Sequence, residues 1–206
     1  RATPLIANQH AWLLGAFGHL HCVRLVDGEI VWKMNFAQKF QTAPLTWGLS
    51  GSPLLVDNRL VMQTGGAQAS LVALDPSTGD VIWAVPGLPP GHASFTTADW
   101  DGQRQIVGYD KASFGGWKTE TGERLWTVVP REPGEFNVPS PIIFGSGFIL
   151  VGENNGTRLY KSENGGESGF EVAKENRALS PNSHTPVISG DRLIGIDNGQ
   201  PLQPLG

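Results

Sequence analysis

Cysteine is nearly absent from this sequence of 206 residues, which contains only Cys22. A disulfide bond within the chain is therefore impossible. No apolar run reaches the eighteen residues of a membrane-spanning helix, and no stretch has the apolar spacing of a long amphipathic helix. The formal net charge is −4 and there is no basic stripe, so a nucleic acid is not expected as a partner.

The sequence is instead rich in repetition, with a period near forty-four residues. Four copies of one segment each place a glycine four residues before a closing aromatic residue. The glycines are Gly28, Gly79, Gly122 and Gly166, and the aromatics are Trp32, Trp83, Trp126 and Phe170. A second landmark, a hydroxyl residue before proline, recurs at Thr3, Ser52, Ser140 and Thr185, and Thr96-Thr97 fills the missing place. Such a period indicates a solenoid, a propeller or another repeat array.

The content of one repeat indicates a propeller. Between Ser52 and Trp83 lie four short segments rich in Val, Leu, Ile and Trp, separated by Gly, Asn, Asp and Pro. Four antiparallel strands in this length make one propeller blade. The predicted fold class is therefore all-β, a β-propeller of four-stranded antiparallel blades. The expected blades span about 1–36, 50–87, 94–130 and 138–174, with a partial blade at 183–199.

The turn that precedes each closing aromatic has a local explanation. The Asp75 side chain can accept hydrogen bonds from the backbone of its own turn, and Gly79 allows a positive φ. The chain then places Trp83 on the outermost strand, where a large ring can cover the joint between two blades. We therefore expect Trp32, Trp83 and Trp126 to be largely buried at such joints, with Phe170 in the equivalent place.

These residues resemble the tryptophan-docking repeat of quinoprotein-type propellers, the pyrroloquinoline-quinone (PQQ) repeat, with the pattern A-x-D-x-x-T-G-x-x-x-W. The copy that ends at Trp83 matches it at every fixed position, through Ala73, Asp75, Thr78 and Gly79. The third copy keeps Thr121, Gly122 and Trp126, the first keeps Gly28 and Trp32, and the last keeps Gly166 with Phe170 in place of Trp. The resemblance implies a closed ring of six to eight blades, so this chain is expected to be a piece of a larger propeller.

The resemblance leaves two classes of function open. Similar repeats build PQQ-dependent alcohol dehydrogenases, and they also build the outer-membrane assembly lipoprotein BamB and sensor domains. The enzymes stack the quinone against a disulfide of two adjacent cysteines and bind Ca²⁺ through Glu and Asn. This chain has only Cys22, in mid-strand, so neither PQQ nor Ca²⁺ is expected in this segment unless the chain is part of such an enzyme.

Two further groups of residues carry two interpretations each, and a third segment is interpreted as a loop. Glu153 and Asn154 resemble the Ca²⁺ ligands, but Asn155-Gly156 between apolar strands is typical of a tight turn, which we favour. His19 and His21 alternate on one strand and could face one metal ion, yet the other histidines lie at no metal-binding spacing. The Gly-rich segment at 108–116 follows no strand-to-helix pattern and is interpreted as a loop.

One connection between blades is longer than the others. The link from Trp32 to Pro53 covers 21 residues, against 14, 15 and 16 for the later ones, and its excess carries Phe40 and Trp47. Loops on a rigid scaffold commonly carry function, so Phe40 and Trp47 mark a candidate binding-face loop. The alternative is that Trp47 packs down on its own blade.

The sequence thus favours a non-catalytic propeller that binds other proteins in the periplasm, at the outer membrane or outside the cell. The alternative is a segment of a PQQ-dependent alcohol dehydrogenase whose cofactor residues lie outside this chain. No acid–base pair for catalysis can be assigned. An arc of blades would expose apolar joints, and we expect the isolated piece to associate.

Overall fold

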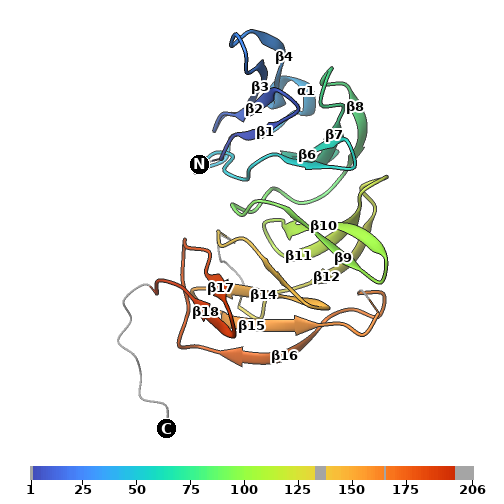
Figure 1. Cartoon of the computed structure of the whole chain (residues 1–206). Helices are drawn as coiled ribbons and strands as arrows, with labels where there is room; N and C mark the ends of the chain where they lie inside the picture. The colour runs from blue at the N-terminus through green and yellow to red at the C-terminus, as the bar shows by residue number, and fades with distance from the viewer. Residues whose placement is uncertain (1, 133–137, 165, 198–206) are drawn as a thin grey trace.

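Four sheets of four strands and one hairpin make up the computed structural model, which describes residues 2–132, 138–164 and 166–197. Arg1 and residues 198–199, which belong to the expected blade ranges, lie outside the described residues. Each large sheet is an antiparallel meander whose strands pair in chain order. Figure 1 shows the sheets following one another from the blue N-terminal blade to the orange fourth blade.

Each blade contains four short strands, which we call A to D in chain order. Blade 1 contains β1 (Leu5–Ala7), β2 (His10–Leu14), β3 (His19–Arg24) and β4 (Ile30–Asn35). Blade 2 contains β5 (Leu54–Val56), β6 (Arg59–Gly66), β7 (Ala69–Leu74) and β8 (Val81–Val85). Blade 3 contains β9 (Thr96–Trp100), β10 (Gln103–Tyr109), β11 (Phe114–Lys118) and β12 (Arg124–Val128). Blade 4 contains β13 (Ile142–Phe144), β14 (Gly147–Gly152), β15 (Gly156–Lys161) and β16 (Glu171–Asn176), and the hairpin β17 (Val187–Ser189) and β18 (Arg192–Ile194) follows.

The predicted all-β propeller fold is confirmed. The A strands begin at Leu5, Leu54, Thr96 and Ile142, within two residues of the positions that the hydroxyl landmarks indicate. One short helix, α1 (Phe36–Phe40), lies in the long link, where Asn35 caps its N-terminus by accepting from the backbone N–H of Gln38. The segment 108–116 was wrongly interpreted as a loop, because it forms the end of β10, a four-residue turn and the start of β11.

The hydrophobic core lies between blades. Along each strand, alternate side chains face the preceding or the following blade, so each joint buries two sheet faces. Trp12, Leu20 and Leu74 share the joint of blades 1 and 2, and Phe95 and Trp117 belong to the joint of blades 2 and 3. The joint of blades 3 and 4 is aromatic, with Trp100, Phe114, Trp126, Phe148 and Tyr160.

The connections divide between two opposite edges of the blades. The turns between A and B strands and between C and D strands lie at one edge, where the backbone N–H of Leu25 donates to the carbonyl of Gln9. We call this edge the turn face. The B–C turns and the D–A links lie at the other edge, the loop face, where Leu49 N–H donates to the carbonyl of Ala16.

Candidate functional site: blade joints and the loop face

The repeat motif forms a docking contact at each joint. Trp32 lies against Gly79 of the next blade, Trp83 against Gly122, and Trp126 against Gly166. A Cβ atom built on these glycines would lie 2.9, 2.6 and 2.7 Å from the ring that covers it. Each glycine therefore has two roles. It allows the positive φ of its own turn, and it makes room for the tryptophan of the preceding blade, a role that the local turn pattern does not reveal.

The docked rings also donate hydrogen bonds, but they are not equally buried. Trp32 Nε1 donates to the carbonyl of Pro76 at 3.0 Å, and Trp83 Nε1 donates to that of Thr119 at 3.1 Å. Trp126 Nε1 instead donates to Oε1 of the buried Gln105 at 2.7 Å. Trp126 is buried with 7% of its surface exposed, whereas Trp32 and Trp83 are only half-buried.

The turn residues of the motif show how the divergent copies compensate. The Asp75 carboxylate accepts from the backbone N–H groups of Ser77 and Thr78, as the pattern predicts. In the first and third copies the Asp is replaced by Arg24, which pairs with Asp27 at 2.8 Å, and by Lys118, which pairs with Glu123 at 2.6 Å. In these copies an ion pair between the cation and an acidic residue of the same turn takes the place of the Asp75 hydrogen bonds. The backbone N–H of Glu29, with a smaller contribution from Arg24, also lowers the pKa of Asp27.

Phe170 and Ala73 complete the motif. Phe170 lies one residue before β16, half-buried, and its ring centroid lies 4.6 Å from that of Trp126 and 4.7 Å from that of Phe148. Ala73 is fully buried on β7, directly opposite Trp83 on β8. Thr78 donates to Asp80 within its turn, and Thr121 accepts from Glu123 N–H in the next copy. All these contacts are structural.

The hydroxyl landmark links successive blades. The backbone N–H of Thr3 donates to Ser52 Oγ at 2.9 Å, and that of Ser52 donates to Ser94 Oγ at 3.0 Å. The backbone N–H of Ser140 donates to Thr185 Oγ1 at 2.8 Å. The hydroxyl therefore serves as the acceptor for the preceding blade, and in blade 3 this role belongs to Ser94 rather than to Thr96 or Thr97.

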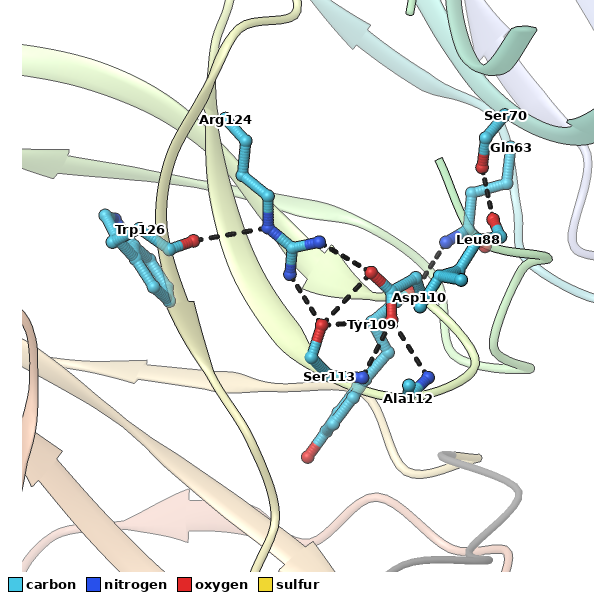
Figure 2. A network of polar contacts seen from close by, with 9 residues as sticks. All are labelled: Gln63, Ser70, Leu88, Tyr109, Asp110, Ala112, Ser113, Arg124 and Trp126. Carbon is cyan, nitrogen blue, oxygen red and sulfur yellow. Dashed lines mark hydrogen bonds and ion pairs between the residues drawn. The ribbon is translucent and has the colours of Figure 1, made fainter. Parts of the chain in front are cut away.

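A polar network at the joint of blades 2 and 3 is the largest feature that sequence reasoning missed (Figure 2). Arg124 Nη1 donates to Asp110 Oδ2 at 2.6 Å, and its Nη2 donates to Ser113 Oγ at 2.8 Å. The Asp110 side chain is only 8% exposed and also accepts from the backbone N–H groups of Ala112 and Ser113. The guanidinium carbon lies 4.6 Å from the ring centroid of Trp117. These polar groups satisfy one another's hydrogen-bonding capacity within the joint.

Gly115 makes room for the Arg124 side chain of this network, and Gly116 makes room for the neighbouring Trp126 ring. A Cβ on Gly115 would lie 2.5 Å from Arg124 Nη2, and a Cβ on Gly116 would lie 2.4 Å from the Trp126 ring. Gln63 of blade 2 donates to the carbonyl of Tyr109, at the end of β10 in blade 3 (Figure 2). Ser70 of blade 2 donates to the carbonyl of Leu88, in the link between these two blades. The pair of glycines in the segment 114–118 was the available signal.

The long link is anchored on the loop face. Phe36 of α1 is fully buried, and its backbone N–H donates to the carbonyl of Gly18 at 2.9 Å. The carbonyl of Phe40 lies against Gly66 of blade 2, and its half-buried ring packs in the core of the first joint. Phe40 therefore supports the link rather than presenting itself to solvent.

Trp47 is displayed at the surface of the same link. Its side chain is 64% exposed, so most of its ring faces solvent. The adjoining Gly48 lies against Ala16, with its built Cβ only 2.7 Å from the carbonyl oxygen of Ala16. Phe17, the neighbour of Ala16 in the B–C turn of blade 1, is 81% exposed. Phe17 and Trp47 therefore flank one tight contact, and we call them the aromatic pair.

Glu153 lies in blade 4, whereas His19 and Cys22 lie on β3 of blade 1. Glu153 lies in the turn between β14 and β15 and accepts from Asn182 at 2.8 Å. His19 is exposed and bonds Asn35 at 2.9 Å. Within residues 2–132, 138–164 and 166–197, no three His, Cys, Asp or Glu side chains could hold a metal ion together. Cys22 is fully buried in β3, so it does not fit a quinone that stacks on paired cysteines.

No helix in the described part of the chain is long and apolar enough to cross a membrane. No curated protein matches the chain in sequence. Among solved structures, it resembles BamB from Moraxella catarrhalis, with 18% identity and a TM-score of 0.62 over 93% of this chain and 53% of that one. It thus spans about half the length of that protein.

Two further structures share the fold. The computationally designed Ika8 protein has 11% identity and a TM-score of 0.54, over 91% of this chain and 52% of that one. The quinohemoprotein alcohol dehydrogenase ADHIIG from Pseudomonas putida HK5 has 14% identity and a TM-score of 0.54, over 82% and 34%. The family described as outer membrane protein assembly factor BamB matches residues 2–201. With the docking repeat at every joint, this match places the chain in the BamB family of PQQ-like β-propellers.

Proposed function

We propose that this chain belongs to a non-catalytic propeller that binds other proteins in the cell envelope or outside the cell. The observation that carries the proposal is the aromatic pair, Phe17 and Trp47, displayed on the loop face by anchored backbone. Exposed aromatic residues on a rigid surface are typical of protein-binding sites. The BamB family, described as an assembly factor of the outer membrane, supports both the partner class and the location.

The anchoring favours binding, because little conformational entropy remains to be lost. Two backbone hydrogen bonds fix the link that carries Trp47. Leu49 N–H donates to the carbonyl of Ala16 at 2.9 Å, and Gly48 N–H donates to the carbonyl of Leu45 at 3.0 Å. A preorganised loop retains more of its contact energy on association than a mobile one does. We place the protein in the periplasm, at the outer membrane or outside the cell, and expect neither PQQ nor Ca²⁺ in this segment.

A photocrosslinking experiment tests this function. Benzoylphenylalanine at position 47 of the full-length protein, in the source cells, should give a discrete adduct with one protein. The matched control is position 144, because Phe144 is an aromatic residue on the turn face with 44% of its surface exposed. Trp47→Ala should abolish copurification of the identified partner, and Phe144→Ala should retain it. Equal crosslinking at both positions would contradict the proposed surface.

A second measurement separates this proposal from the dehydrogenase alternative. The full-length protein, supplied with PQQ, Ca²⁺ and an alcohol, should not reduce an artificial electron acceptor. Reduction that is lost in Glu153→Ala would overturn the non-catalytic proposal.

A further inference from the structure

Charge is divided between the two faces of blades 1 to 3. Across residues 2–128, all but one of the ten carboxylates lie at or beside turns of the turn face. These nine are Asp27, Glu29, Asp57, Asp75, Asp80, Asp99, Asp101, Glu120 and Glu123. The cations at or beside those turns are Arg24, Arg59, Arg104, Lys118 and Arg124, the last of which is paired with Asp110, so carboxylates exceed cations there. The turn face of these blades is therefore acidic.

The loop face of the same blades lacks exposed carboxylates. Its one acidic residue, within the described range 2–128, is Asp110, which is buried and paired with Arg124 at 2.6 Å. Lys39 on α1 and Lys111 in the B–C turn of blade 3 are exposed there, whereas Lys33 lies in one row with His21 and Leu13 on the outward sheet face of blade 1. The segment 30–56, which carries the long link, contains both Lys33 and Lys39 and no Asp or Glu.

The aromatic pair stands within this acid-free surface. Phe17 and Trp47 supply apolar contact area, and the exposed Lys39 lies on α1 of the same link as Trp47, which contains no Asp or Glu. A basic surface around an apolar centre complements an acidic segment that carries an apolar anchor. The opposite face, with its excess of carboxylates, would repel the same segment.

We infer that the loop face of blades 1 and 2 binds an acidic peptide segment with an apolar or aromatic anchor, supplied by another protein. This inference rests on the proposed function and names the chemistry of its partner. The anchor packs on Phe17 and Trp47, and the carboxylates of the segment face Lys39 and its neighbours. Such rim charges mainly set the association rate and the choice of partner, and salt weakens them.

Synthetic peptides test the inference on the full-length protein. The probe is a fluorescein-labelled peptide in which Glu alternates with Leu around a central Phe, and its charge-reversed match carries Lys for Glu. We expect the acidic peptide to bind at least about tenfold more tightly than the basic one, measured by fluorescence anisotropy. Raising the salt concentration from 50 to 300 mM should weaken it several-fold.

Two variants and their controls locate the site. Trp47→Ala should weaken binding of the acidic peptide by about tenfold, the effect of a buried aromatic contact worth about 1.4 kcal/mol, whereas Phe144→Ala should have no effect. Lys39→Glu should weaken binding several-fold and reduce its salt dependence, whereas Lys174→Glu on the exposed β16 strand should not. Unchanged circular dichroism melting would show that each variant is folded.

The outcomes distinguish the inference from the proposed function. Equal affinity for acidic and basic peptides would overturn the acidic partner, while a crosslinked partner at position 47 would keep the proposed function. Binding of anionic lipid vesicles, but not of the peptide, with the same dependence on Lys39 would overturn the inference in favour of a membrane surface. Absence of peptide binding together with absence of a crosslink would contradict both.

Discussion

The ring of Trp83 lies so close to Gly122 of the next blade that a Cβ there would come within 2.6 Å of it. The same relationship joins Trp32 to Gly79 and Trp126 to Gly166. Gly28 occupies the same motif position and has a similar φ of +75°, but a Cβ built there meets no atom within 4 Å. The chain thus contains its own control for the docking contact.

Gly122→Ala is therefore expected to destabilise the protein more than Gly28→Ala. Both substitutions place Cβ at a positive φ, which costs about 1–2 kcal/mol. Only Gly122→Ala also pushes the indole of Trp83 aside, which adds about 1–3 kcal/mol of overpacking. Urea unfolding of the two variants measures the difference, and equal midpoints would show that the ring does not bear on the glycine.

The docked tryptophans are expected to contribute unequally. Trp126→Ala should cost about 3–5 kcal/mol, because the ring is buried and stacks with Phe148 at 5.5 Å and 8°. Trp83→Ala should cost roughly half as much, because the half-buried Trp83 ring removes less apolar surface from water on folding. Urea midpoints again provide the measurement. A smaller effect at Trp126 than at Trp83 would contradict this order.

Features of the fold could be predicted from the sequence where the residues that determine them are close together in the chain. The strands and turns follow from residues close in sequence, such as Asp57-Asn58, whose φ angles of 46° and 56° suit a two-residue hairpin turn. The ring that covers Gly122 comes from another blade, so the turn pattern alone could not reveal that contact. The hydroxyl landmark predicted where A strands begin, but not that Ser94 accepts the bond in blade 3.

The candidate site was predictable only in part. The length of the link pointed to Phe40 and Trp47, but not to which of them is exposed, because burial depends on contacts with blade 2. Phe17 had no sequence signal beyond a short turn. The pairing of Arg124 with Asp110 joins β12 to the turn before β11, and its trace in the sequence was Gly115, which makes room for the Arg124 side chain.

Breaking the ion pair between Arg124 and Asp110 should be costly. Arg124→Met leaves the Asp110 carboxylate buried without its cation, and we expect a loss of about 2–4 kcal/mol. The matched control is Lys118→Met, which removes an exposed pair with Glu123 and should cost about 0–1 kcal/mol. Adding Asp110→Asn to Arg124→Met should recover part of the loss. An additive double variant would show that the two side chains are not coupled.

His92 is expected to make stability depend on pH. Burial lowers the pKa of His92, whose ring bonds Ser50 Oγ at 3.0 Å. The unfolded chain, with a His pKa near 6.5, then binds a proton more readily than the folded protein. Stability should therefore fall as the pH drops below about 6.5, through the folded pKa. His92→Gln should flatten this dependence in thermal melts, and His184→Gln, at an exposed position, is the control.

Association of the 206-residue chain is expected through the outward face of blade 1. Ile6 and Ile30 lie in one row of that sheet and are 64% and 51% exposed, and Leu13 on the same side is 38% exposed. Apolar faces of this kind are removed from water when copies associate, and each buried Å² contributes about 25 cal/mol. Sedimentation velocity at micromolar concentration should therefore show oligomers.

Charge on that face should suppress the association. Ile6→Lys with Ile30→Lys should shift the chain to monomers, because each lysine would have to be desolvated in the contact. Val26→Lys is the matched control, since Val26 is 80% exposed but lies in the C–D turn rather than on the sheet face. If the unsubstituted chain is monomeric at every concentration, these isoleucines make no contact between copies, and the prediction is wrong.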